Sequence, residues 1–93
     1  MIRSFKCKDA ERIFNRRFTK KISRALHRVT LRKLRMLNRA NSLQDLQLPP
    51  GNRLEVLLGN RKGQHGIRIN KQWRICFRWH ENDAFDVEIA DYH

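Results

Sequence analysis

The sequence predicts an α+β fold, a two-layer domain in which two helices cover one face of a mainly antiparallel sheet. Two segments with helical periodicity lie in the first half of the chain. A short alternating segment precedes them, and four segments of alternating apolar and polar residues follow. Short polar turns between the later segments imply antiparallel neighbours. The predicted order is therefore β-α-α-β-β-β-β, in a single domain over residues 1–93.

The N-terminal segment predicts one short strand and one short helix. Ile2 and Phe5 flank two polar residues, which we interpret as a strand over residues 2–5. Apolar residues then recur at helical spacing, so we expect a helix from Asp9 to Arg17 with Asp9 as its N-cap.

The strongest helical period runs from Ser23 to Ala40. We expect one side to face the core, with Lys33 near its middle extending its ammonium group out to water. That apolar side comprises Ile22, Ala25, Leu26, Val29, Met36, Leu37 and Ala40.

Six basic residues form a separate stripe on this helix, about 80° wide at 100° per residue. They are Lys21, Arg24, Arg28, Arg32, Arg35 and Arg39. Such residues often form an ordinary solvated face. However, like charges four positions apart repel each other, and no acid lies in the stripe, which favours contact with a polyanion. Both interpretations stay open.

Residues 41–52 form a connector whose three leucines are expected to pack back on the core; these are Leu43, Leu46 and Leu48. Alternation predicts a strand over residues 53–57, with Leu54 and Val56 on one face. A polar, basic loop over residues 59–64 follows.

Residues 66–79 predict a hairpin with Asn70–Gln72 as its turn. The expected cross-strand pairs are Ile69 with Trp73, Arg68 with Arg74, and Ile67 with Ile75. Like charges directly opposite destabilise a sheet unless an anion or an acidic neighbour lies on them.

A turn over residues 81–84 and a last strand complete the predicted sheet. Phe85, Val87 and Ile89 are expected on its apolar face. Asp86, Glu88, Ala90 and Tyr92 are expected on the other face. This second sheet face is expected to be open and polar, and to carry Arg68, Arg74 and Arg78.

Composition limits the class of partner and the cellular compartment that we expect. The formal net charge is +12 and the isoelectric point about 11.1, which favours a polyanionic partner bound in a salt-dependent manner. Cys7 and Cys76 lack disulfide or metal-site spacing, so we expect reduced thiols of a cytoplasmic protein. The N-terminus lacks a long apolar run, so neither a signal peptide nor a membrane contact is expected. The acids and histidines predict no metal site.

The remaining chemistry fits RNA cleavage without a metal. RNA carries its own nucleophile, the 2′-hydroxyl, so the protein needs a proton acceptor, a proton donor and cations for the phosphate. Arg68 and Arg74 supply cations, and His93 has a suitable pKa range for proton transfer. Tyr92 can donate a hydrogen bond or stack on a base. Alternatively, acids of the last strand simply pair with arginines across the sheet, namely Asp86 and Glu88 with Arg74 and Arg78.

Two segments carry a resemblance to a known family: SLQDLQLPPGNRLEVLLGNRKGQHGIRINKQWRICFRW and the terminal DVEIADYH. The whole chain resembles HigB-type toxins of the RelE superfamily, also called host-inhibition or killer proteins. The most specific parts are the IRINKQWRICF hairpin and the ending Asp91-Tyr92-His93.

The resemblance implies a RelE-like fold and a toxin of a type II toxin–antitoxin system. Its activity would be ribosome-dependent cleavage of translated mRNA, without a cofactor, which inhibits translation. The implied partners are a HigA-type helix-turn-helix antitoxin, mRNA and the bacterial ribosome, with operator DNA bound only through the antitoxin complex.

The resemblance also implies roles for single residues. Arg74 would stabilise the scissile phosphate, and Asp91, Tyr92 and His93 would form the catalytic C-terminal ending. Cations that would support the phosphate are Arg68, Arg61 and Lys62, while the basic stripe would contact ribosomal RNA. Many members carry Lys just before the loop glycine, where this chain has Leu58. A non-catalytic relative that binds RNA or ribosomes, and mainly its antitoxin, is the alternative.

Overall fold

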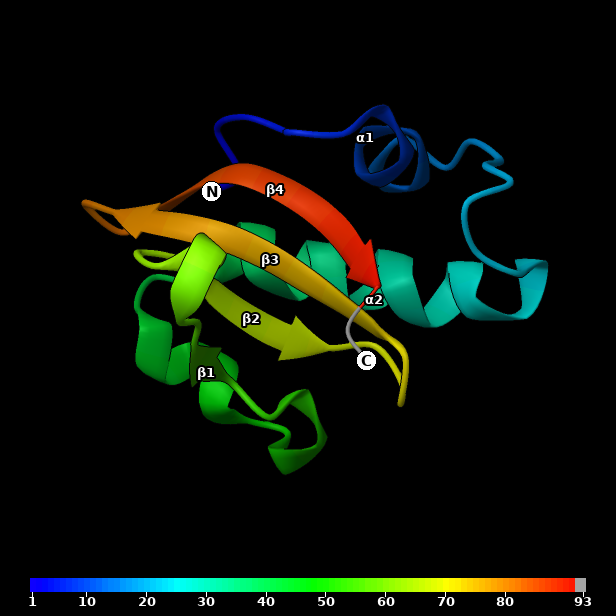
Figure 1. Ribbon diagram of the computed structural model, residues 1–93. Coiled ribbons are helices and arrows are strands. Elements are labelled where there is room, and N and C mark those ends of the chain that lie inside the picture. The colour runs from blue at the N-terminus through cyan, green and yellow to red at the C-terminus, as the bar shows by residue number, and fades with distance from the viewer. Residues whose placement is uncertain (92–93) are drawn as a thin grey trace.

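A computed structural model describes residues 1–91 and shows two helices and a four-stranded antiparallel sheet. The strands follow one another in the order β1-β2-β3-β4. In Figure 1, α2 lies behind the sheet and α1 lies beside β4 at the top. The bounds are α1 Lys8–Phe14, α2 His27–Arg39, β1 Glu55–Val56, β2 His65–Arg68, β3 Trp73–His80 and β4 Asp83–Asp91. This arrangement confirms the predicted α+β fold.

The hairpin between β2 and β3 has the predicted register. Arg68 lies opposite Arg74 and Ile67 lies opposite Ile75. The turn is closed by Asn70, whose Oδ1 accepts hydrogen bonds from the backbone amides of Gln72 at 2.9 Å and Trp73 at 2.7 Å. A side-chain oxygen that bonds amides two and three residues ahead favours this kind of turn.

The turn between β3 and β4 is tighter than predicted. His80 pairs with Asp83, so only Glu81 and Asn82 lie outside the ladder. Their φ angles of 49° and 67° are both left-handed, as in the two-residue turns that match the twist of a hairpin. β4 therefore begins at Asp83, before the position expected from alternation.

A bulge at Asp86 changes which residues of β4 face the core. Cys76 pairs with Glu88, but Arg78 pairs with Phe85, so β4 has one extra residue between these pairs. Asp86 has a φ of 53°. An extra residue reverses the alternation beyond it. Ala84 is therefore fully buried in place of Phe85, and the predicted position of Phe85 on the core face is wrong.

The N-terminal segment makes two isolated parallel bridges with β4 where a strand was predicted. Ile2 pairs with Ala84 and Phe5 with Val87. The two bridges lie on opposite sides of the bulge, which interrupts regular pairing between them. The segment still adds an extended chain along the outer edge of β4.

Helix α1 is shorter than predicted and has a different cap. Cys7 is the N-cap, and its sulfur accepts from the amide of Ala10 at 3.5 Å. The helix ends at Phe14, and Arg16 has a left-handed φ of 63°, which stops the helical path. Asp9 lies inside the helix and accepts a hydrogen bond from the hydroxyl of Thr19.

Helix α2 is preceded by the 3-10 turn η1 (Arg24–Leu26). The side of the helix that is buried is rotated about the helix axis relative to the predicted side. Its buried residues are Thr30, Lys33, Leu34 and Leu37, whereas Ala25 is exposed. At 100° per residue, this buried side lies opposite the basic stripe. All six stripe residues are exposed.

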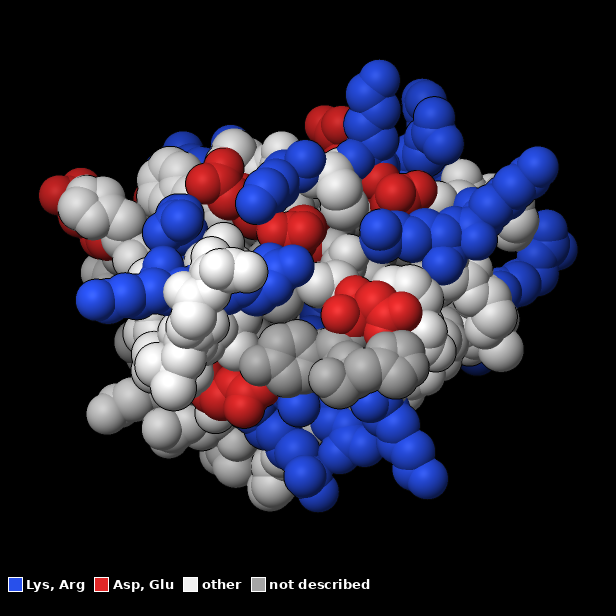
Figure 2. Space-filling view, viewed as in Figure 1, with Lys and Arg blue, Asp and Glu red and all other residues white. Residues whose placement is uncertain are grey.

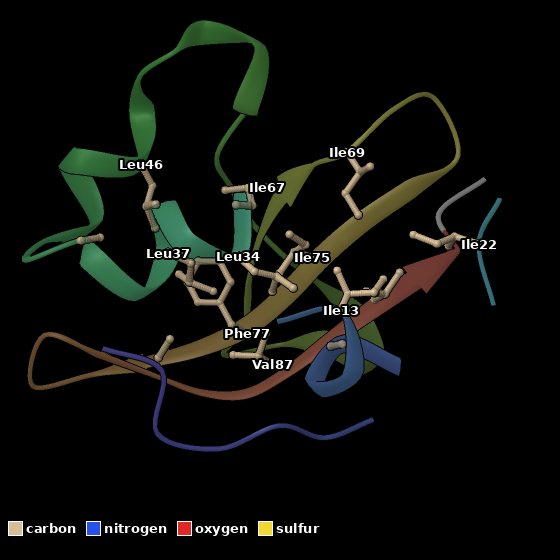
Figure 3. Packing of buried hydrophobic residues seen from close by; sticks show 14 residues of the cluster. Ile13, Ile22, Leu34, Leu37, Leu46, Ile67, Ile69, Ile75, Phe77 and Val87 are labelled. Atoms are coloured by element: carbon tan, nitrogen blue, oxygen red, sulfur yellow. The ribbon is translucent and has the colours of Figure 1, made fainter. Parts of the chain in front are cut away.

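The core lies between the sheet and the helices. Figure 3 shows Leu34 and Leu37 of α2 pointing toward Ile75 and Phe77 of β3. Leu46 of the connector is fully buried in the same cluster, as predicted. By contrast, Leu48 is 69% exposed, so its predicted packing on the core is wrong, and Val56 of β1 is 66% exposed. The strand prediction over residues 53–57 reduces to the two-residue β1.

Candidate active site

An ion pair lies on the sheet face opposite α2 and joins β1 to β3. Arg74 Nη1 lies 2.9 Å from Glu55 Oε1, and both atoms are shielded from solvent. The Arg74 side chain is only 18% exposed, whereas that of Glu55 is 40% exposed. Glu55 is opposite Gly66 in the register and therefore lies near the strand that carries Arg74. Glu55 is thus the acidic neighbour that offsets the cross-strand pair of Arg68 and Arg74.

The basic loop folds over the same face. Its 3-10 turn η4 (Gly59–Arg61) crosses in front of β3 in Figure 1. Arg61 Nη1 donates to Glu88 Oε2 on β4 at 3.0 Å and to Gln64 Oε1 at 3.2 Å. Lys6 Nζ lies 3.5 Å from the same Glu88 oxygen. The predicted phosphate ligand Arg61 therefore holds the loop against β4.

A third ion pair on this face joins β3 to β4. Arg78 Nε lies 3.6 Å from Asp86 Oδ2, and both side chains are half exposed. Asp86 therefore pairs with Arg78 as one alternative expected. Glu88 pairs instead with Lys6 and Arg61, while the acid on Arg74 is Glu55.

The face that we expected to be open is partly covered. Leu57, Cys76 and Ala90 form a small buried apolar cluster beside the ion pairs. The Leu57 side chain packs so closely over Gly66 that a Cβ atom on residue 66 would lie 3.4 Å from it. Burial raises the pKa of the Cys76 thiol above its ordinary value. Arg74 lies beside this buried apolar cluster, where its attraction to Glu55 is stronger than it would be in water.

The remaining predicted residues lie at different places. Arg68 is half-buried, and its Nε donates to the carbonyl of Asn70 at 3.0 Å. Lys62 is exposed, as is Leu58, which is 80% exposed at the start of η4. Asp91 is opposite Trp73 at the end of β4 and accepts from Gln72 Nε2 at 3.1 Å. Tyr92 and His93 lie outside the described residues.

Figure 2 shows acidic side chains scattered among basic ones on this face, so its charges are interleaved.

Over residues 1–91, no group of three or more His, Cys, Asp or Glu side chains could hold a metal ion. No helix within that range is long and apolar enough to cross a membrane.

Comparison with known proteins identifies the family. Residues 3–93 match the family described as HigB-like toxin, the RelE-like toxin of the type II toxin–antitoxin system HigB. The chain belongs to the HigB-like toxin family. It is therefore the toxin of a type II toxin–antitoxin system, and an antitoxin is its partner.

Two HigB proteins are similar to this HigB-like toxin. Toxin HigB-1 of Vibrio cholerae is 41% identical over 68 residues, which cover 73% of this chain and 72% of that protein. A protein of Proteus vulgaris named Endoribonuclease HigB is 30% identical over 94 residues and the full length of both chains.

A solved structure supports the fold. The YoeB–YefM complex from Staphylococcus aureus contains a chain that matches all of this one with a TM-score of 0.56. The match covers 98% of that chain at 15% identity, so it shows the fold alone. The RelE-like architecture expected from the sequence is therefore confirmed.

Glu55 is the residue of the candidate site that sequence reasoning missed. Alternation alone places Glu55 and Leu57 on the same side of an edge strand. Pairing with Arg74 additionally depends on the register of β1 against β2, which no short-range signal fixes.

Proposed function

We propose that this HigB-like toxin is a ribosome-dependent endoribonuclease that cleaves translated mRNA by metal-free acid–base chemistry and so inhibits translation. The observation that carries the proposal is the Arg74–Glu55 pair on the sheet face. Family membership and the name of the Proteus vulgaris relative support the reaction class.

Arg74 supplies the cation for the phosphate. Its guanidinium is held at Nη1 by Glu55, so its orientation is set before RNA arrives. A preorganised donor stabilises the charge that develops on phosphorus without moving during the reaction. The arginine fork also suits two phosphate oxygens. Arg68, on the neighbouring strand, and exposed Lys62 would add positive charge.

Glu55 is our proposed proton acceptor for the 2′-hydroxyl. Its carboxylate is partly exposed, and the oxygen held by Arg74 fixes the group beside the phosphate cation. Proton transfer by a positioned group contributes roughly 10²- to 10⁴-fold to a rate. By resemblance, Asp91, Tyr92 and His93 complete the site, with His93 as a proton-transfer group and Asp91 orienting it or acting as a base.

The proposed partners follow from charge and family. The antitoxin would be of the HigA type, with a helix-turn-helix that binds operator DNA for the complex. The basic stripe of exposed residues on and before α2 would contact ribosomal RNA. Those residues are Lys21, Arg24, Arg28, Arg32, Arg35 and Arg39. These reactions belong to the cytoplasm, where ribosomes translate mRNA.

Primer extension on a translated message tests the activity. With ribosomes and the toxin, we expect new 5′ ends inside translated codons, and without ribosomes we expect none. Intact messages in both conditions, with ribosomes still bound, would favour the non-catalytic relative, which the exposed Leu58 in place of lysine keeps as the second candidate.

Single variants test the site. Arg74→Ala and deletion of Tyr92-His93 should abolish cleavage, and Glu55→Gln should reduce it by roughly 10²- to 10⁴-fold. Asp86→Asn is the matched control, because Asp86 also pairs with an arginine on this face but at a half-exposed position. Equal cleavage by Glu55→Gln and Asp86→Asn would remove Glu55 from the reaction. Circular dichroism should show that each variant folds.

A further inference from the structure

Phe18 presents an aromatic ring to solvent in the connection between α1 and α2. This residue is 52% exposed. The guanidinium carbon of Arg24 lies 5.2 Å from the ring centroid, and the ring of His27 lies 5.3 Å away at 43°. An exposed ring of this size forgoes burial that would stabilise the fold. A bound ligand would supply that burial.

The backbone around Phe18 is held in place from both sides. Thr19 is buried, and its hydroxyl donates to Asp9 of α1. His27 Nε2 lies 3.1 Å from the carbonyl of Thr19 and 3.3 Å from that of Ile22. A carbonyl only accepts, so Nε2 carries the hydrogen. These bonds fix the segment that carries Phe18, which lowers the entropic cost of binding through its ring.

The surroundings of the ring are mainly basic, and the one acid among the described residues that line the hollows beside Phe18 is Asp9, which accepts a hydrogen bond from Thr19. Phe18 borders a hollow of about 380 Å³ whose polar lining includes Arg16, Arg17, Arg24 and Arg28. Of the described residues that line it, none is acidic. A second hollow of about 570 Å³ continues along α2, and it shares Arg28 and Leu31 with the first. Figure 2 shows basic side chains projecting at the right, where the connection between the helices lies in Figure 1.

We propose that Phe18 is a stacking site for an unpaired base of structured RNA, with the surrounding arginines holding the flanking phosphates. Unpaired bases stack on aromatic rings and arginine planes, whereas paired bases offer no open face. The exposed ring and the arginines supply both halves of such a site. An acidic protein segment would satisfy the charges but has no need of a planar ring. The inference deepens the proposed contact with ribosomal RNA and rests on it.

Fluorescence anisotropy with two labelled RNA hairpins tests the proposal. One hairpin is fully paired, and the other is identical except for a single bulged adenine. Wild-type protein should bind the bulged hairpin more tightly. Phe18→Ala and Phe18→Leu should weaken binding to the bulged RNA roughly tenfold to hundredfold and bring it to the level of the paired RNA. The dependence on salt should not change, because no charge is removed.

Two further variants serve as controls. Phe18→Trp keeps a flat aromatic surface and should retain the preference for the bulge. Leu48→Ala removes another exposed apolar side chain, on the connector, and should behave as wild type. Thermal unfolding shows that each variant folds, and Phe18→Leu keeps apolar volume if the alanine variant does not fold.

The outcomes are separable. Equal binding of the bulged hairpin by Phe18→Leu and wild type would overturn the proposal, as would equal losses for both hairpins. Unchanged RNA binding with a weakened antitoxin complex would assign the ring to protein contact and also overturn it. Message cleavage is measured separately: absent cleavage with an intact bulge preference would refute the endoribonuclease and keep the stacking site.

Discussion

Lys33 is a buried cation on α2 whose partner is neutral. Its side chain was expected to reach water, but the residue is 6% exposed and Nζ donates to Asn52 Oδ1 at 2.7 Å. Burial lowers its pKa below the ordinary value of 10.5, and the charges of Arg32 and Arg68 lower it further. The charged form is therefore less favourable in the folded protein than in the unfolded chain.

The stability of the protein should consequently depend on this lysine at alkaline pH. Between the lowered pKa and 10.5, the unfolded chain holds a proton that the folded protein has released. Stability rises with pH where the unfolded state binds more protons, so Lys33 should add stability as pH rises through this window. Because the raised pKa of the Cys76 thiol acts in the opposite direction in both proteins, the measure is the difference in urea unfolding between wild type and Lys33→Met, which should grow in favour of the wild type as pH rises through this window.

Lys71→Met is the matched control for this measurement, because Lys71 is exposed in the hairpin turn. It should keep the pH profile of the wild type. The same pH profile in Lys33→Met and wild type would show that burial of this ammonium does not perturb its titration.

At the scale of elements, Asn52 holds the connector against α2. Asn52 is fully buried at the end of the 3-10 turn η3 (Pro50–Asn52). Its amide nitrogen donates to the carbonyls of Leu46 and Leu48 at 3.1 and 3.3 Å, while its oxygen accepts from Lys33. One side chain therefore joins the turns of the connector to the helix.

Removing this amide should loosen the whole connector. Asn52→Ala leaves the buried Lys33 nitrogen and the buried carbonyl of Leu46 without their partner, and each buried unsatisfied group costs about 1–3 kcal/mol. We expect a loss of about 2–6 kcal/mol in the free energy of unfolding, measured as a lower urea midpoint at unchanged slope. Asn60→Ala, at an exposed position of η4, should change the midpoint little. A similar midpoint in both variants would contradict the proposed linkage.

The elements also show which features sequence patterns predict. The β2–β3 hairpin was predicted with its register because Asn70 and the alternation around it are local signals. Asp86 gave no such signal, since the same residues alternate perfectly in the sequence while the bulge shifts the strand. The side of α2 that is buried was misjudged because the predicted side left out Thr30 and Leu34, which packing against distant segments buries.

The candidate site likewise contains residues that local motifs predict and residues that only the assembled sheet reveals. The resemblance places Arg74 and the C-terminal ending by motif, and geometry then adds Glu55 through pairing between strands. The prediction that Arg61 serves a phosphate meets a competing partner, because Glu88 lies 3.0 Å from it. Long-range pairs of this kind depend on the assembled sheet, so a single sequence does not reveal them.

At the scale of the whole molecule, the net charge of +12 is unevenly distributed. On the sheet face, Glu55, Asp86 and Glu88 each lie near a cation. On α2, the buried side lies opposite the stripe, which turns its arginines outward together. Two hollows along this helix are lined by arginines, and none of their described lining residues is acidic. The position of charge, as well as its total, should therefore govern binding to the ribosome.

Two double variants with the same net charge separate the effect of the position of the charges on ribosome binding from the effect of the total charge. Arg28→Glu with Arg35→Glu alters the stripe, whereas Lys8→Glu with Arg53→Glu alters exposed cations that line neither hollow along α2. Each cation that contacts a phosphate adds about one unit to the salt slope of binding. In ribosome co-sedimentation across a salt series, the stripe variant should bind more weakly and lose about two units of slope. The other variant should keep the slope, since a change in total charge alone acts over distance and is screened by salt. Equal losses in both would mean that the stripe is a solvated face and that overall basicity draws the toxin to the ribosome.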